Sequence, residues 1–443
     1  MHISVLGTGY VGLVTGACFA EFGLSVTCMD VDPNRIEMLE NGEVPFYEPG
    51  LAELVAKGRK SGNLQFTTDL NAALDTALVI FIAVGTPSRP DGSADLSYVD
   101  EVARSIGTRM TGYKVVVTKS TVPVGTAKRV RELIKSQQST PINFDVASNP
   151  EFLREGSAIG DFMRPDRVVI GVDSDQAAAI MKDLYRPLYL IEAPVVVTNV
   201  PTAEMIKYAS NVFLATKISF INEVANLCES VDANVQVVAK AMGLDKRIGS
   251  KFLHAGPGYG GSCFGKDTAA LVHIGEQAGY EMKLAATTKR VNEQQGGRMV
   301  DKIRDTLGGV QGKTVALLGL SFKPNTDDLR DSPALMIADH LMKEGCTVRA
   351  HDPEGQKEAL KRHPGLVGCE DAYDAAHGAD AIVLATEWNQ FRNLDLDQMK
   401  TLLKAPVLID LRNVYDSARV AEKGFYHVSV GRPSAGVNPH QKA

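Results

Sequence analysis

The sequence predicts an α/β protein with two Rossmann-like, doubly wound parallel-sheet domains joined by a long central helix. Short runs rich in valine and isoleucine alternate with amphipathic stretches over residues 1–200, and the alternation returns after residue 310. Such uninterrupted apolar runs are typical of strands that are buried on both faces of a parallel sheet. Between these regions, residues 202–230 carry apolar side chains at helical spacing.

The first region contains the apolar runs that we expect to form its sheet. They are Ile3–Leu6, Ser25–Met29, Leu78–Val84, Lys114–Thr118, Phe144–Ala147, Arg167–Val172 and Val195–Val197. Helices between these runs would cover both faces of the sheet, so residues 1–200 are expected to form one domain.

A different pattern begins at Thr202, which is placed to cap a helix. No proline or glycine occurs from there to Ser230, so the helix would be about 40 Å long at ~1.5 Å per residue. Further helices are expected at 235–242 and from about Asp267 to Gly279. A central helical domain is therefore expected over residues 201–300.

The strand and helix alternation resumes after Gly308 and Gly309 and predicts a smaller α/β domain over residues 310–432. Its expected strands are Thr314–Leu318, Thr347–His351, Ala381–Ala385 and Val407–Leu411. Residues from Arg432 onward show no periodicity, so we expect them to fray.

Composition and charge narrow the possible functions. The chain has 47 Lys and Arg against 53 Asp and Glu, a net charge of −6, which disfavours nucleic acid as a partner. The apolar run Ala77–Val84 is far shorter than the roughly 18 residues of a membrane helix, and no signal peptide is expected at the N-terminus. The six cysteines lack C-x-x-C spacing, which indicates free thiols and a cytoplasmic location, and the nine histidines show no metal-ligand spacing.

A glycine pattern, Gly7-x-Gly9-x-x-Gly12, follows the first expected strand and opens a helix. In a dinucleotide site these glycines allow a tight turn, a close approach of the pyrophosphate and close packing of helix on strand. Asp30 follows at roughly the 20-residue spacing of the carboxylate that accepts a ribose hydroxyl. This carboxylate would repel a 2′-phosphate, so NAD is favoured over NADP, although Arg35 lies nearby. The alternative is a glycine turn with no ligand.

The loops after three later strands agree with a ligand site. They contain Gly85-Thr86-Pro87, Ser120-Thr121-Val122-Pro123 and Asn149-Pro150-Glu151. Ligands of open parallel sheets bind beyond the carboxyl ends of the strands, so these three small or polar loops would face one crevice.

Cys263 is the cysteine that is best placed to be a reactive thiolate. It follows Gly260-Gly261-Ser262 and precedes a helix, and both the helix N-terminus and Lys266 would stabilise a thiolate. A small buried thiol at a tight turn is the alternative. The other five cysteines lie in helical or strand patterns and are expected in the core.

Two pairs of polar residues are spaced to share a helix face. Lys207 and Asn211 could hold an oxyanion, although spacing alone more often indicates a solvated face of a long helix. Glu151 and Glu155 would share a face of a short helix, where paired carboxylates are usually exposed to solvent.

Motifs along nearly the whole chain resemble the nucleotide-sugar 6-dehydrogenases. They are GTGYVG (7–12), EPGL (48–51), VGTP (84–87), STVPVGT (120–126), NPEFLREGSAI (149–159), AEMIKYASN (203–211), RIGSKFL (247–253), GYGGSCFGKD (258–267), GLSFKPNTDDLRDSP (319–333) and DLRN (410–413). Many bacterial members have proline at the position of Gly265. The glycine of this chain makes the turn looser.

The resemblance implies oxidation of a primary alcohol at C6 to a carboxylate with two NAD per sugar. Cys263 would form a thiohemiacetal and then a thioester, which water cleaves. Lys207 and Asn211 would stabilise the oxyanion, and Asp267 would position water. Glu151 and Thr121 would assist proton transfer.

The resemblance also implies binding residues. NAD would contact Gly7, Gly9, Tyr10, Val11, Gly12, Asp30, Arg35, Thr86, Thr121, Glu155, Lys266 and Arg330. The sugar nucleotide would contact Glu151, Phe152, Leu153, Lys207, Asn211, Arg247, Phe252, Leu253, Gly260, Lys323 and Arg412. Such enzymes are commonly homodimers through the helix at 202–230, and Arg247 can reach the partner's substrate.

The wording of RIGSKFL and GGSCF favours the UDP-glucose branch, with UDP-glucuronate as product, over a GDP-mannose or UDP-N-acetylhexosamine dehydrogenase. A single-step β-hydroxyacid dehydrogenase is a second hypothesis, since that class uses a lysine but needs neither a thiol nor a second α/β domain. A non-catalytic sensor of NAD or a nucleotide sugar is the third.

Overall fold

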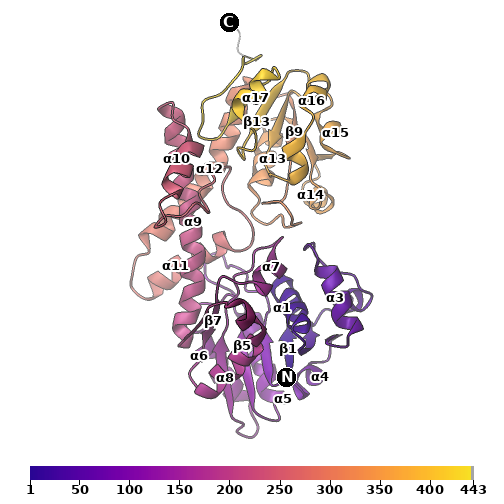
Figure 1. Ribbon diagram of the computed structural model, residues 1–443, viewed down its shortest axis with the longest axis vertical. Helices are drawn as coiled ribbons and strands as arrows, with labels where there is room; N and C mark the ends of the chain where they lie inside the picture. The colour runs from indigo at the N-terminus through magenta and orange to yellow at the C-terminus, as the bar shows by residue number, and fades with distance from the viewer. Residues whose placement is uncertain (441–443) are drawn as a thin grey trace. The chain divides into compact units, whose positions relative to one another are not determined.

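The computed structural model describes residues 1–440 and has two compact units. The first contains Met1–Ser210 and Ala270–Glu281, and the second contains Asn211–Ala269 and the residues from Met282 onward. Each unit holds a sheet with helices packed against it (Figure 1). The expected α/β class is confirmed, while the expected division into three domains stays a prediction.

The sheet of the first unit has eight strands in the order β3-β2-β1-β4-β5-β6-β7-β8. They are β1 His2–Leu6, β2 Ser25–Met29, β3 Leu64–Thr67, β4 Val79–Ile82, β5 Lys114–Thr118, β6 Phe144–Ser148, β7 Val168–Gly171 and β8 Val195–Thr198. The sequence did not predict β3, because as an edge strand it alternates buried and exposed residues. The sheet is also not wholly parallel, since β7 pairs antiparallel with β6 through Ser148 and Gly171.

Helices cover both faces of this sheet. One face carries α1 Tyr10–Glu21, α2 Pro33–Glu40, α3 Leu51–Lys60, α7 Ala158–Met163 and α8 Asp175–Leu184, and the other carries α4 Leu70–Asp75, α5 Ser97–Arg109 and α6 Thr126–Gln137. A 3-10 helix, η1, follows at Arg186–Ile191. The loop at 151–157 is not helical, so the prediction that Glu151 and Glu155 share a helix face was wrong.

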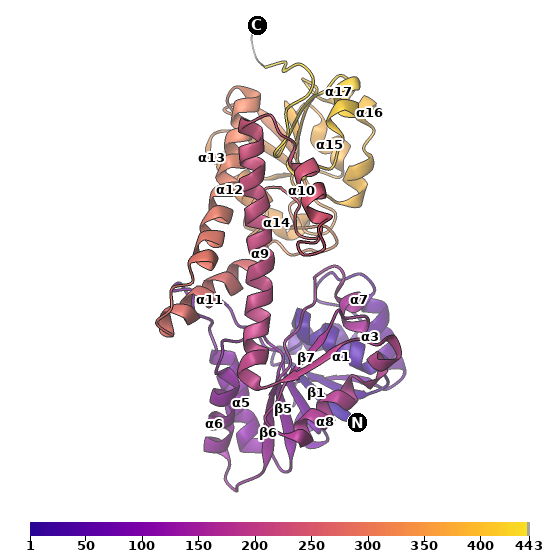
Figure 2. The same cartoon turned by 60° about the vertical axis from the view of Figure 1, so that its left-hand side comes forward.

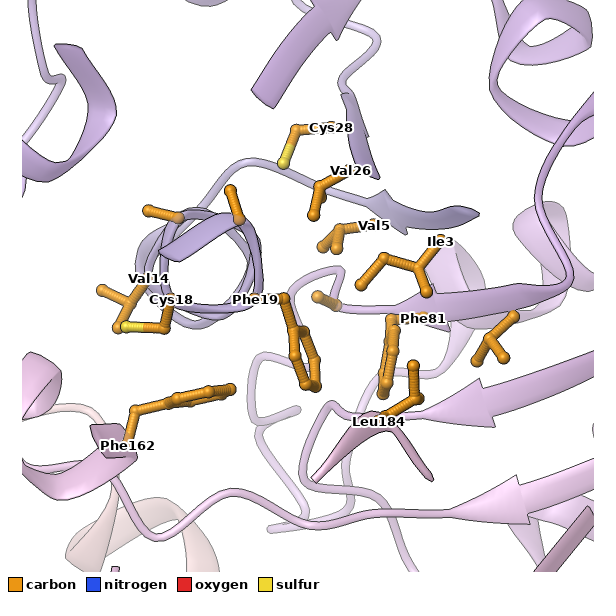
Figure 3. Packing of buried hydrophobic residues seen from close by; sticks show 14 of the residues in the cluster. Ile3, Val5, Val14, Cys18, Phe19, Val26, Cys28, Phe81, Phe162 and Leu184 are labelled. Carbon is orange, nitrogen blue, oxygen red and sulfur yellow. The ribbon is translucent and has the colours of Figure 1, made fainter. Parts of the chain in front are cut away.

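The core of the first face is centred on Phe19 of α1, whose side chain is fully buried. Its ring centroid lies 5.3 Å from Phe81 of β4, 5.0 Å from Phe162 of α7 and 5.3 Å from Tyr185. Figure 3 shows the Phe19 ring between those of Phe81 and Phe162. One aromatic side chain thus joins the helix that follows the glycine turn to the sheet and to α7.

The long helix α9 runs unbroken over Val200–Ser230 (Figure 2). It begins before Thr202, because the Asn199 side chain accepts the Thr202 backbone N–H at 2.9 Å. The expectation that Thr202 caps the helix was therefore wrong. It is followed by α10 Val235–Gly243 and α11 Phe264–Gln277.

The next helix, α12 Lys283–Leu307, was not predicted. Its sequence contains Gly296-Gly297, a pair that normally weakens a helix. A Cβ at Gly296 would lie 1.8 Å from Met336 Cε of α13, so the glycine leaves the space that the Met336 side chain occupies between the two helices.

The sheet of the second unit is parallel, with six strands in the order β11-β10-β9-β12-β13-β14. They are β9 Thr314–Leu318, β10 Thr347–His351, β11 Val367–Gly368, β12 Ala381–Leu384, β13 Val407–Asp410 and β14 Tyr426–Ser429. Its helices are α13 Pro333–Lys343, α14 Gln356–Arg362, α15 Ala372–Ala376, η2 Asn389–Asn393, α16 Leu396–Leu402 and α17 Ser417–Glu422.

Residues 432–440 pack against the second unit, contrary to the expectation that they fray, and the last three positions of that expectation lie outside the described residues. The Arg432 side chain is buried and donates to Ser429 Oγ at 3.0 Å. His427 and Ala435 exchange two backbone hydrogen bonds, at 2.8 and 3.0 Å, so the chain folds back along β14.

The two units repeat one plan that the sequence does not show. Gly7 and Gly319 follow the first strand of their sheets with φ of 101° and 92°. Each donates its backbone N–H to the end of the next strand at 2.8 Å, Gly7 to Met29 and Gly319 to His351. Within residues 1–440, no helix is both long and apolar enough to cross a membrane.

We predict that Phe19→Ala lowers the free energy of unfolding by about 3–5 kcal/mol, because the cavity would open among three aromatic rings. Phe22→Ala, at the end of the same helix and half-buried, should cost clearly less. Urea unfolding followed by circular dichroism measures both, and equal losses would contradict the central place of Phe19.

Candidate active site

The glycine turn between β1 and α1 leaves space at one of its three glycines. A Cβ at Gly7 would lie 2.8 Å from Ala83 O, and a Cβ at Gly12 would lie 1.9 Å from Gly7 O. A Cβ at Gly9 would meet nothing within 4 Å. The backbone is therefore closely packed at Gly7 and Gly12 and open at Gly9. Because Gly9 lies beside the N-terminus of α1, this open position fits a pyrophosphate at that helix end.

Asp30 lies at the end of β2 with its carboxylate oriented by Thr8. Its Oδ2 accepts the Thr8 backbone N–H at 2.7 Å and the Thr8 hydroxyl at 2.8 Å, and its Oδ1 accepts the Asp32 N–H at 3.1 Å. Burial alone would raise the pKa of Asp30, but these hydrogen bonds and Arg35, at 3.6 Å, hold it below its ordinary value. The ionised Oδ1 can accept a further hydrogen bond, as a ribose hydroxyl requires.

The equivalent carboxylate of the second unit, Asp352, is saturated. It accepts backbone N–H groups of Leu320, Ser321, Glu354 and Gly355, the Ser321 hydroxyl and the Trp388 indole, at 2.7–3.1 Å. A carboxylate offers about four lone-pair sites, so none is left for a ribose. Of these two carboxylates, only Asp30 can therefore take part in a dinucleotide site.

The residues around the glycine turn are tied to two loops. The Tyr10 hydroxyl donates to Glu48, and burial raises the pKa of Tyr10. Glu48 also accepts the N–H groups of Gly156 at 2.5 Å and Ala158 at 2.8 Å. Glu48 thus fixes the loop that carries Glu155, a role that the EPGL motif did not reveal.

Val11 is partly exposed and directly precedes the buried part of α1, which begins at Gly12. The Thr86 hydroxyl donates to Thr121 O at 2.9 Å. This bond joins the loops after β4 and β5. The latter loop is also held by Glu204 of α9, whose carboxylate accepts the N–H groups of Gly125 at 2.7 Å and Ala127 at 2.9 Å.

Glu151 and Lys207 form a buried ion pair in the first unit. Lys207 Nζ lies 2.8 Å from Glu151 Oε1, and the Leu153 N–H donates to Glu151 at 2.6 Å. Burial alone would raise the pKa of Glu151, but Lys207 and the hydrogen bonds hold it below its ordinary value. The Phe152 ring faces Lys207 at 5.4 Å. Because both side chains of the pair are buried, the solvated-face alternative is wrong for Lys207.

A second buried polar pair lies in the second unit. Asn211 Nδ2 donates to Asp267 Oδ2 at 2.6 Å, and Lys266 Nζ lies 2.8 Å from Asp267 Oδ1. Asn211 is one turn after Lys207 on α9. Asp267 is thereby oriented by both an amide and an ammonium.

Cys263 stands immediately before α11. Its carbonyl accepts the Asp267 N–H at 2.8 Å, and the Ser262 hydroxyl lies 3.5 Å from its Sγ. Its side chain is partly exposed, whereas the other five cysteines are buried as expected. Burial raises the pKa of Cys18 and of Cys28 to about 12, which makes those thiols poor nucleophiles.

The loop before Cys263 is packed too closely for side chains. A Cβ at Gly260 would lie 2.3 Å from Asp331 O, and one at Gly261 would lie 2.7 Å from the Phe322 ring. The Gly261 N–H donates to Arg330 O at 2.8 Å. The glycines therefore place the thiol loop against residues 322–331, which include two predicted ligand-binding residues, Lys323 and Arg330.

Side-chain amides that the sequence reasoning missed clamp the same loop. Asn292 of α12 accepts the Tyr259 N–H at 2.8 Å and donates to Tyr259 O at 3.0 Å. Asn222 of α9 accepts the Gly256 N–H at 2.9 Å, and Gln295 donates to Gly256 O at 2.8 Å. Asn292 and Gln295 lie at i, i+3, which was the signal available in the sequence.

The other residues of the second unit that were predicted to bind substrate differ in burial and in the groups that they contact. Leu253 is buried, Phe252 adopts a φ of 65°, and Lys323 faces the Phe322 ring at 5.1 Å. Arg247 is exposed and paired with Asp245 at 2.6 Å.

Two arginines that were predicted to bind ligand, Arg412 and Arg330, contact other groups of the protein. Arg412 donates to Ala385 O and Phe322 O, each at 2.8 Å, and Arg330 lies 2.8 Å from Asp328. Arg412 therefore holds the segment that carries Lys323.

Three family models match the chain. They describe the NAD binding domain, the central domain and the UDP binding domain of the UDP-glucose/GDP-mannose dehydrogenase family, and they match residues 1–189, 201–294 and 316–417.

Curated relatives and solved structures agree with these models. A UDP-glucose 6-dehydrogenase of Rhizobium meliloti is 53% identical over 437 residues, covering 98% of this chain and 100% of the relative. One from Bacillus subtilis is 49% identical, covering 99% of this chain and 95% of the relative. The structure of a UDP-glucose dehydrogenase from Pyrobaculum islandicum superposes with a TM-score of 0.90 at 40% identity, covering 98% of each chain.

We predict that Asp30→Ala weakens NAD binding at least about tenfold, equivalent to ~1.4 kcal/mol, because the ribose loses a charged acceptor. Asp32→Ala is the control, because it removes a helix cap two residues away without removing that acceptor. Isothermal titration calorimetry measures both dissociation constants. Equal weakening in the two variants would contradict the assignment of Asp30.

Proposed function

Because the chain belongs to the UDP-glucose/GDP-mannose dehydrogenase family, it is an NAD-dependent oxidoreductase, and we propose that Cys263 carries its oxidation of UDP-glucose to UDP-glucuronate. The observation that supports this role is the accessible thiol at the start of α11, with the buried Asn211–Asp267 pair in the same unit. NAD, when bound, supplies the hydride acceptor for each of the two oxidation steps.

The first step converts the C6 alcohol to an aldehyde and releases one proton. The Lys207–Glu151 pair is the proposed acceptor of that proton, with Thr121 assisting. Both members of the pair are buried, so a charge that develops on the substrate oxygen there is screened little by water.

In the second step the Cys263 thiolate adds to the aldehyde carbon. The carbonyl oxygen becomes the oxyanion of a thiohemiacetal, which Asn211 and Lys207 stabilise by ~3 kcal/mol per donor. Loss of the second hydride leaves a thioester on Cys263, so the aldehyde never leaves the enzyme.

In the last step water cleaves the thioester and regenerates the thiol. Asp267 is the proposed residue that positions this water. Its carboxylate accepts from Asn211 and Lys266, which fixes its orientation, and it shares the first turn of α11 with Cys263.

The other candidate functions, a β-hydroxyacid dehydrogenase and a dehydrogenase of another nucleotide sugar, are less well supported than oxidation of UDP-glucose. A β-hydroxyacid dehydrogenase needs neither Cys263 nor a second α/β unit. The high identity to UDP-glucose 6-dehydrogenases favours UDP-glucose over GDP-mannose and UDP-N-acetylhexosamines. The extents of the family models also support our division into domains at 1–200, 201–300 and 310–432.

The proposal includes a homodimer through α9. Phe213, Phe220 and Leu227 recur every seven residues on this helix and are 48–65% exposed. Such a stripe on a long helix is typical of a surface that pairs with another helix. Free cysteines are consistent with a cytoplasmic location, which we propose as well.

We predict that the wild-type protein releases two NADH for each UDP-glucose and that Cys263→Ala makes no UDP-glucuronate while it still binds UDP-glucose. Cys228→Ala removes the same atom from a buried position and should keep the two-to-one ratio. NADH absorbance and chromatography of the product measure these outcomes. A ratio of one, or acid formation by Cys263→Ala, would refute the proposed role of the thiol.

We predict that Phe220→Glu converts the dimer to monomers at micromolar concentration, because it places a carboxylate within the apolar stripe. Leu190→Glu, in η1 of the first unit and 89% exposed, is the matched control and should stay dimeric. Sedimentation velocity distinguishes the species. A dimer that survives Phe220→Glu unchanged would contradict an α9 interface.

A further inference from the structure

Lys119 is a buried lysine of the first unit that the proposed mechanism does not use. It follows β5, and its ammonium donates to Asn149 Oδ1 at 3.0 Å and to the Tyr185 hydroxyl at 3.3 Å. Both acceptors are neutral, so neither balances its positive charge. Burying an ammonium without a compensating charge costs free energy, so the charged groups nearest to Lys119 decide whether it is protonated.

The surroundings of Lys119 include the proposed catalytic ion pair. Lys119, Asn149, Tyr185 and Glu151 line one cavity of about 40 Å³, large enough for a single water molecule. Glu151 in turn pairs with Lys207 at 2.8 Å. Two buried ammonium groups therefore act on one buried carboxylate.

The charges around Lys119 oppose one another. Burial lowers the pKa of Lys119, attraction by Glu151 acts to raise it and repulsion by Lys207 acts to lower it, and together they place it at about 8. Lys119 therefore changes its charge close to neutral pH.

Two further charged groups line the same cavity. Arg167 stacks on the Phe152 ring, with its guanidinium carbon 3.5 Å from the ring centroid, and Asp161 pairs with Arg154 at 2.5 Å. Asp161 is thus neutralised by its own partner. Arg167 stays charged across the pH range in which Lys119 titrates, so it adds a constant positive field.

We propose that Lys119 is a positioning residue that sets the charge state of the Lys207–Glu151 pair across the shared cavity, without touching the substrate. A nearby cation favours the ionised carboxylate and disfavours a second ammonium, so a charged Lys119 lowers the pKa of both partners. The inference rests on the proposed function, in which this pair takes the proton of the substrate alcohol.

The test is the pH dependence of kcat with UDP-glucose in Lys119→Met, which removes the charge and keeps a similar length. Both partner pKa values then rise, so the limb of the profile set by the pair should move to higher pH by at least about 0.5 unit. The KM for UDP-glucose should change less than kcat. A profile that superimposes on that of the wild type would overturn the inference.

Lys114→Met is the matched control. Lys114 is buried at the other end of β5 and donates to the carbonyls of Leu74 and Ala77, each at 2.7 Å. Its loss should lower stability without moving the pH profile. Tyr185→Phe removes one acceptor of the Lys119 ammonium, so it should move the limb in the same direction by less, and it replaces Lys119→Met if that variant does not fold.

A second readout does not depend on activity. The Lys119 proton leaves the folded protein near pH 8, whereas an unfolded lysine holds it to about pH 10.5. The unfolded chain therefore binds more protons in that window, and the free energy of unfolding of the wild type should rise relative to Lys119→Met from pH 8 to 10. A flat difference would overturn the inference. If wild-type protein makes no UDP-glucuronate but this difference rises, the proposed function fails, whereas the lowered pKa of the buried Lys119 ammonium stands.

Discussion

The proposed active site is held together by buried polar side chains, each of which needs a hydrogen-bonding or charged partner. Glu151 and Lys207 are buried and neutralise each other at 2.8 Å, and Asn211 and Asp267 are buried and joined at 2.6 Å. Breaking either pair would leave a charge or an amide without a partner in the protein interior, which costs several kcal/mol. The pairing therefore fixes the side chains to which we assign the chemistry, and Lys207 and Asn211 keep a one-turn spacing because α9 is continuous.

The glycines of the chain serve two distinct purposes. At Gly7 and Gly12 they allow the backbone to pack against itself, which leaves the open position at Gly9 for a phosphate. At Gly260 and Gly261 they bring the thiol loop onto Asp331 and the Phe322 ring. Gly319 of the second unit makes the same turn as Gly7, but the equivalent carboxylate there, Asp352, is saturated, whereas Asp30 keeps a free acceptor.

Local patterns predicted much of the fold and many of the candidate site residues. Buried strands such as β4 are continuous apolar runs, and the motifs around Cys263 and Gly7 are short in sequence. Features that depend on distant contacts were missed. The edge strand β3 alternates buried and exposed residues, and His427 and Ser429 interrupt the apolar run of β14. The glycine pair at 296–297 argued against a helix, because the packing of Gly296 against Met336 of α13 cannot be read from the sequence. Glu48, Lys119 and Asn292 were missed for the same reason, since their partners lie 30 or more positions away.

The central claim is that a covalent bond to Cys263 links the two oxidations. Its most direct test is mass spectrometry of Asp267→Asn, quenched in acid during incubation with UDP-glucose and NAD, because loss of the carboxylate should slow cleavage of the thioester by water. The account predicts a UDP-glucuronyl thioester on the peptide that contains Cys263. Formation of UDP-glucuronate by this variant with the Cys263 peptide unmodified at every time point would contradict it.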